Sequence, residues 1–134
     1  MIIVSTDGRR LVDVGSSDIW HSIYSTAVDA FGLGKNKISR ALKFMEEGIC
    51  HGENGYETAR QFNLIRDAFA RISPDKAIYD IKDKKKKAPW HGNISPVITS
   101  CANLHTTADG KDLLFEVVSI LTYGQIAEVD VIIE

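Results

Sequence analysis

Two kinds of periodicity divide this chain, and their order limits the folds it can adopt. Short β-branched segments stand near both ends: IIVST and RLVDVG come first, and AEVDVIIE comes last. Segments of this composition favour strands. Apolar residues at helical spacing fill much of the chain between them. Strands separated by a run of helices are typical of an α+β domain.

The β-branched segments are expected to form one antiparallel sheet. DGR separates the first two and is a strong turn signal, which predicts an N-terminal hairpin. Val129, Val131 and Ile133 alternate along the last segment and therefore share one face of a strand. We expect this C-terminal strand to pair with the hairpin, and the sheet to pack against several helices.

Helical spacing predicts four longer helices, each ended by a glycine or a proline. They are a helix over SSDIWHSIYSTAVDAFG that Gly32 ends, a second that Asn36 caps and Gly48 or Gly52 ends, a third over residues 56–72, and a last one through Leu114 and Leu121 that ends near Gly124. The apolar stripe of the second helix holds Ile38, Ala41, Leu42, Met45 and Ile49. The helical aromatic residues are predicted to lie in the core: Trp20, Phe31, Phe44, Phe62 and Phe69.

Two short apolar runs lie between the third and the last helix. AIYDI, residues 77–81, alternates enough to predict a strand. Ser95 and Pro96 favour a helix start, so a short helix is predicted from Pro96 to about Asn103, although VITS fits a strand equally well.

Length and composition fit one domain over residues 1–134. The chain is near the commonest domain size, and 44% hydrophobic with 25% charged residues is ordinary for a globular protein. No apolar run approaches the roughly 20 residues that span a bilayer, and MIIVSTDGRR lacks the order of a signal peptide. We therefore expect a cytoplasmic protein with no membrane partner, whose Cys50 and Cys101 are free and mostly buried.

Residues 88–105 hold the residue types of a cysteine hydrolase. Cys101 would be the nucleophile, His91 or His105 its base, and Asn103 the group that holds the ring. Cys101 has Ile98 and Ala102 as apolar neighbours, however, which favours a buried thiol. The hydrolase is kept as an alternative hypothesis.

Metal and cofactor sites are not expected. The chain has six histidines and cysteines, but no CxxC, HxxxH or HExxH spacing that would bring two of them onto one face. GLGKNK lacks the full phosphate-loop pattern and does not follow a predicted strand, so helix termination explains its glycines.

Charge is distributed unevenly. Residues 82–87, the lysine segment, contain five lysines and one aspartate and carry +4, while the rest of the chain holds 11 basic and 17 acidic residues and carries −6. The lysine segment is predicted to be a solvated loop. A nucleic-acid adaptor that uses it is a second alternative, although no aromatic residue lies among the lysines to stack on bases.

Acidic residues lie on the predicted polar faces and loops, where they favour solubility or form a docking face for a basic protein. Trp90 follows Pro89 and is interpreted as a half-buried anchor or an exposed contact. The candidate partner-binding residues are Glu46, Glu47, Glu53, Glu57, Asp75, Asp80, Asp83 and Trp90.

The C-terminal half resembles a known family. ISPDKAIYD, PWHGNISPVITSCAN and TADGKDLLFEVV occur in this order and lead into an alternating strand. This order is similar to that of an immunity-protein family of bacterial polymorphic toxin systems, including contact-dependent growth inhibition. The resemblance rests on Pro89-Trp90, Asn93-Ile94-Ser95, Ile98-Thr99-Ser100, Ala102-Asn103 and Asp109-Gly110-Lys111-Asp112-Leu113.

The resemblance implies a small cytosolic protein without catalysis or cofactor, which binds one cognate toxin domain and occludes it. We expect the toxin to be a nuclease, with tRNA as one candidate substrate, and no direct contact between this chain and nucleic acid. It also implies that residues 88–105 are scaffolding: Pro89 and Trp90 brace a loop, Asn93 and Ser95 bond its turn, and Ile98 packs inward.

Overall fold

Strands from both ends of the chain meet in one sheet in the computed structural model, which describes residues 1–134. The strands are β1 (Ile2–Ser5), β2 (Leu11–Asp13), β3 (Ile49–Cys50) and β4 (Val131–Ile133), in the order β2-β1-β4-β3. All neighbouring strands are antiparallel. The predicted α+β class, with a hairpin that pairs with the C-terminal strand, is confirmed. β3 was not predicted, because Ile49 was assigned to a helical stripe.

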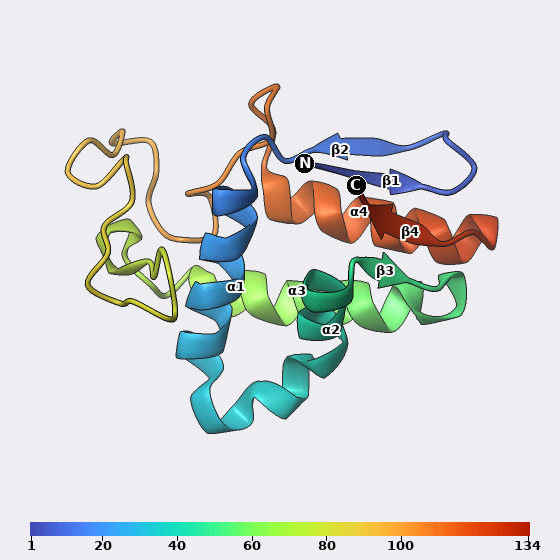
Figure 1. Ribbon diagram of the computed structural model, residues 1–134, viewed down its shortest axis with the longest axis horizontal. Coiled ribbons are helices and arrows are strands. Elements are labelled where there is room, and N and C mark those ends of the chain that lie inside the picture. Colours follow the sequence, from blue (N-terminus) through green and yellow to red (C-terminus); the bar gives the residue numbers. More distant parts are fainter.

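Four α-helices lie between β2 and β4 along the chain (Figure 1). They are α1 (Ser17–Phe31), α2 (Ser39–Glu47), α3 (Gly55–Phe69) and α4 (Leu113–Ala127), with short 3-10 helices at Gly32–Ile38, Gly52–Asn54 and Pro74–Lys76. Ser16 caps α1, and the Asp112 carboxylate caps α4 by accepting from the Phe115 amide at 3.2 Å. None of these helices is long and apolar enough to cross a bilayer.

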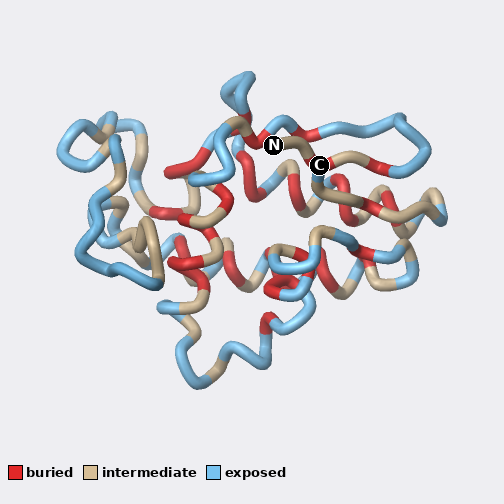
Figure 2. The backbone as a smooth tube through the Cα atoms, viewed as in Figure 1, coloured by how far each residue is buried: buried red, intermediate tan, exposed pale blue.

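The core lies between α4 and one face of the sheet, and between the helices themselves. Ile3, Val12 and Val131 point inward from the sheet and are buried. Gly55 at the start of α3 lies against the end of α4, while Arg66 near the end of α3 reaches Asp112 at the start of α4, so the two helices run antiparallel. Figure 2 shows buried residues along the facing sides of these elements.

Four of the five predicted core aromatics are buried, and only Phe31 is half-exposed. Trp20, Phe44 and Phe62 form one cluster with ring centroids 6.2–6.3 Å apart. These contacts join α1, α2 and α3.

Several predicted boundaries were wrong. α2 begins at Ser39 because Gly32–Ile38 forms a 3-10 helix, where Asn36 had been expected to cap an α-helix. α4 continues through Gly124 to Ala127, and Glu128 in the left-handed region ends it. Gly124 serves a close approach instead, since a Cβ there would lie 2.9 Å from Cγ2 of Val131.

The predictions for residues 70–112 were also wrong, since this segment has neither a strand at 77–81 nor a helix at 96–103. The amides of Ile78 and Ile81 bond to side-chain hydroxyls on α1 and not to a neighbouring strand. The amides of Thr99 and Ser100 donate to the Asn103 side-chain oxygen and not to main-chain carbonyls of a helix. The segment is a long series of turns, most of which lies on the side of α1 away from β3 (Figure 1). Its last part lies against the end of β2, where the Ala108 amide donates to the Asp13 carbonyl at 2.9 Å.

Candidate functional site

The structure divides the eight predicted partner-binding residues into two groups. Glu46 and Glu47 end α2, and Glu53 and Glu57 lie in the turn and first helical turn after β3. The other four, Asp75, Asp80, Asp83 and Trp90, belong to residues 70–112. α1 lies between the two groups in Figure 1. The eight residues therefore do not form one continuous face.

An acidic hollow of about 500 Å³ lies beside the first group, and none of the residues that line it is apolar. They are His51, Gly52, Glu53, Gln125, Glu128 and Asp130. β3 ends at its rim, and the end of α4 forms its other wall. We call this feature the acidic hollow.

Hydrogen bonds hold the walls of the acidic hollow in place. The Asp130 carboxylate accepts from the Gly52 amide at 3.0 Å and lies 3.3 Å from Nδ1 of His51. Gln125 accepts from the Tyr56 amide at 2.6 Å and so satisfies a free N–H at the start of α3. These bonds fix the backbone between β3 and α3 against the end of α4, so the acidic hollow is preformed.

Two carboxylates of the acidic hollow have no partner within the chain. Glu53 and Glu128 are exposed and make no side-chain hydrogen bond or ion pair. Glu128 is the one non-glycine residue with positive φ, at 58°, where it ends α4. The hollow can receive a cationic side chain, and its residues do not form a cluster able to hold a metal ion.

The sequence identified only Glu53 among these residues. Asp130 carried a usable signal, because it alternates with Val129 and Val131 and so faces away from the apolar side of the strand. Glu128 gave no signal, since its place depends on where α4 ends.

Two of the other three acidic residues near β3, Glu47 and Glu57, have local partners. Glu47 lies 4.0 Å from Nζ of Lys43. Hydrogen bonds from Arg60 and Gln61 lower the pKa of Glu57 to about 2. Glu46 is exposed and has no such partner.

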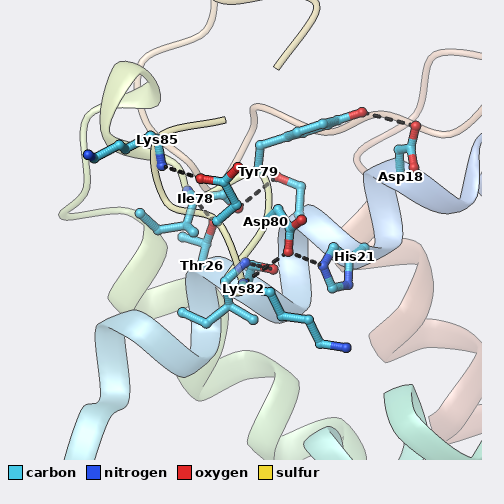
Figure 3. Close-up of polar contacts among 12 residues, drawn as sticks. Asp18, His21, Thr26, Ile78, Tyr79, Asp80, Lys82 and Lys85 are labelled. Carbon is cyan, nitrogen blue, oxygen red and sulfur yellow. Dashed lines mark hydrogen bonds and ion pairs between the residues drawn. The ribbon is translucent and has the colours of Figure 1, made fainter. Parts of the chain in front are cut away.

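The lysine segment is tied to α1 through the residues just before it (Figure 3). The Asp80 carboxylate is 3.1 Å from Nε2 of His21, and this hydrogen bond is the main cause of its lowered pKa. Tyr79 donates to Asp18 at 2.9 Å. Lys84 pairs with Asp29 at 2.7 Å. Five exposed lysines surround Asp83, so this end of the molecule is basic and its aspartates serve local bonds.

The cysteine–histidine arrangement does not form a nucleophile–base pair. The Cys101 thiol is buried and donates to the Ser73 carbonyl at 3.4 Å, and burial raises its pKa to about 11. His105 is buried too, which lowers its pKa to about 4. Neither His91 nor His105 hydrogen-bonds to the thiol. An activated thiol has a lowered pKa, so the observed shift is in the wrong direction.

Asn103 serves its own loop and not a histidine ring. Its side-chain oxygen accepts from the amides of Thr99 and Ser100 at 3.1 and 3.2 Å, and its Nδ2 donates to the Val97 carbonyl at 3.1 Å. This is the behaviour of a turn residue.

Trp90 is half-buried and holds the loop against the core. Its ring meets Tyr79 and His105 edge-on, at centroid distances of 5.6 and 5.4 Å. Asn93 bonds to Trp90 through its amide, and the Ser95 hydroxyl accepts from the Val97 amide at 3.4 Å.

Comparison with known families identifies the class of this protein. The family model described as Immunity protein 70 matches residues 4–133. The chain therefore belongs to the Immunity protein 70 family, and its role is to neutralise a toxin. The predicted resemblance to an immunity-protein family is confirmed, and it extends to both halves of the chain. Neither the comparison with curated proteins nor that with solved structures gives a match.

Proposed function

We propose that this immunity protein binds the catalytic domain of a nuclease toxin in the cytoplasm and occludes it, without chemistry of its own. The single observation that carries the proposal is the acidic hollow with its unpaired carboxylates, Glu53 and Glu128. A nuclease must hold phosphates, so the surface around its active site is basic. Carboxylates at a preformed surface attract and orient such a partner.

The proposed contact residues near β3 are Glu46, Glu47, Glu53 and Glu57, together with the rest of the acidic hollow. Asp75, Asp80, Asp83 and Trp90 make up a second candidate surface. Lysines surround the aspartates there, which makes that surface less suited to a basic partner.

A non-enzymatic role is supported by the buried thiol of Cys101 and by the loop bonds of Asn103. Family membership supports the same role. A nucleic-acid adaptor has only the exposed lysines of residues 82–87 in its favour.

The test uses the toxin domain encoded by the neighbouring gene. We expect this domain to cleave RNA or DNA in vitro, and an equimolar amount of the immunity protein to stop cleavage. The double variant Glu53→Lys/Glu128→Lys should slow association and reduce the protection of cells that express the toxin. Asp67→Lys on the exposed side of α3 is the matched control.

Two results would contradict the proposal. A toxin domain that leaves both RNA and DNA intact would rule out the nuclease. Full protection by the double variant, with unchanged association rate, would remove the acidic hollow from the interface.

A further inference from the structure

The sheet has one face that no other element covers. Val4 of β1 is in register with Leu11 of β2 and with Ile132 of β4, and Ile132 is in register with Ile49 of β3. Residues in register share a face, so these four side chains form one row across all four strands. We call them the apolar row.

The apolar row points away from the core. The residues next to its members, Ile3, Val12, Cys50 and Val131, are the buried ones. Leu11 is 58% exposed and Ile49 is 37% exposed, while Val4 and Ile132 are half-exposed although they lie on the two central strands. None of the four packs against the core cluster.

Acidic residues flank the apolar row on both sides. Ile2 is in register with Asp13 and exchanges two main-chain hydrogen bonds with Glu134, at 3.0 and 2.8 Å, so these carboxylates share the outer face. On the other side, two residues from Ile132, lies Asp130 at the rim of the acidic hollow. An apolar centre with a charged rim is the usual composition of a protein interface.

We propose that the outer face of the sheet is the surface on which the toxin domain docks, with the apolar row at the centre and basic toxin residues against the rim. This inference rests on the proposed function, and it adds the location of the contact and the chemistry of its centre. A second copy of this chain fits less well, because Asp13 and Glu134 of one copy would meet the same charges on the other. Strand addition at an edge is disfavoured because β2 and β3 are only three and two residues long.

The experiment measures the affinity between the full-length immunity protein and the purified toxin domain from the neighbouring gene. Leu11→Lys and Ile49→Lys each place a charge on the apolar row at a position that is already exposed, so the fold should persist and circular dichroism checks it. We expect each variant to weaken binding at least tenfold. Leu33→Lys, at a fully exposed leucine outside the sheet, is the matched control and should bind like the wild type.

Each outcome has a definite meaning. Folded Leu11→Lys and Ile49→Lys that bind as tightly as the wild type would overturn the docking face. If the wild type is a dimer in light scattering and Leu11→Lys is a monomer, the outer face is the contact between two copies of this chain, and the proposal that the toxin docks there is overturned as well. A toxin domain that binds the wild type but cleaves no nucleic acid would end the nuclease proposal and leave the docking face standing. A domain that does not bind the wild type at all would overturn both.

Discussion

The Thr26 hydroxyl makes two hydrogen bonds with one residue of a distant segment: it accepts from the Ile78 amide at 3.0 Å and donates to the Ile78 carbonyl at 3.2 Å. Figure 3 shows this pair beside the His21–Asp80 contact. A helical side chain thus provides both bonds that a neighbouring strand would have given to Ile78.

Thr26→Val should loosen the segment that follows Ile78. The change keeps the shape of the side chain but leaves the partly buried Ile78 amide without a partner, while the Ile78 carbonyl keeps only its bond from the Ser22 hydroxyl at 3.3 Å. An unpaired buried amide costs about 1–3 kcal/mol of unfolding free energy. Urea unfolding measures the loss, and hydrogen exchange at Ile78 should speed up. Thr122→Val is the control, because its hydroxyl bonds only to Val118 within α4. Equal stability of the two variants would contradict the prediction.

Gly55→Ala should destabilise the contact between α3 and α4. A Cβ on Gly55 would overlap the Leu121 carbonyl oxygen, and main chain at such a contact cannot move aside cheaply. Overpacking of this kind costs about 1–3 kcal/mol, and here the upper part of that range is expected. Gly34→Ala has open space around it and no positive φ, so it should leave the melting temperature unchanged or raise it. Similar melting temperatures for both variants would show that the close approach is absent.

Acid should act on His105. Burial lowers its folded pKa from 6.5 to about 4, so the unfolded chain takes up this proton first as the pH falls. Burial of the neutral His105 ring therefore costs no stability above pH 6.5, where the unfolded chain is also neutral at this residue. The free energy of unfolding falls as the pH is lowered from 6.5 through 4, by about 3 kcal/mol in total. Between pH 7 and 4 the wild type should therefore lose more stability than His105→Phe, as measured by urea unfolding at each pH. Parallel pH profiles would mean that His105 has the same pKa in the folded and the unfolded chain.

Cys101 should react slowly with iodoacetamide in the folded protein. Its thiol is buried and its raised pKa leaves almost no thiolate at pH 7.5. Labelling followed by mass spectrometry should become fast only after urea is added. Rapid labelling in native buffer, lost in Cys101→Ser, would revive the hydrolase hypothesis.

The helices and the terminal strands were predictable because burial imposes a period on them. α1 and α3 each have a buried and an exposed side, as the spacing of their apolar residues predicted. The alternating β-branched segments at the two ends favoured strands that pair in one sheet. Gly48 also ended α2 as expected, with φ of 79°.

Residues 70–112 were not predictable, because they form local turns without a period and several of the main-chain bonds that place them go to side chains far away in the sequence. The hydroxyls of Ser25 and Thr26 hold residues 77–81, and no local pattern in AIYDI identifies these partners. The outer face of the sheet was not predictable for a related reason. The apolar row depends on the register of the strands, and the sequence placed Ile49 of β3 on the apolar stripe of the second predicted helix.

The pairing of β1 with β4 joins residues 2–5 to residues 131–133. Long-range pairing of this kind is slow to form, and it cannot begin on the ribosome until the last strand has emerged. If the toxin docks on this sheet, a nascent chain that still lacks β4 cannot bind the toxin. Protection of the cell would then require that folded, full-length immunity protein is present before the first toxin molecule becomes active.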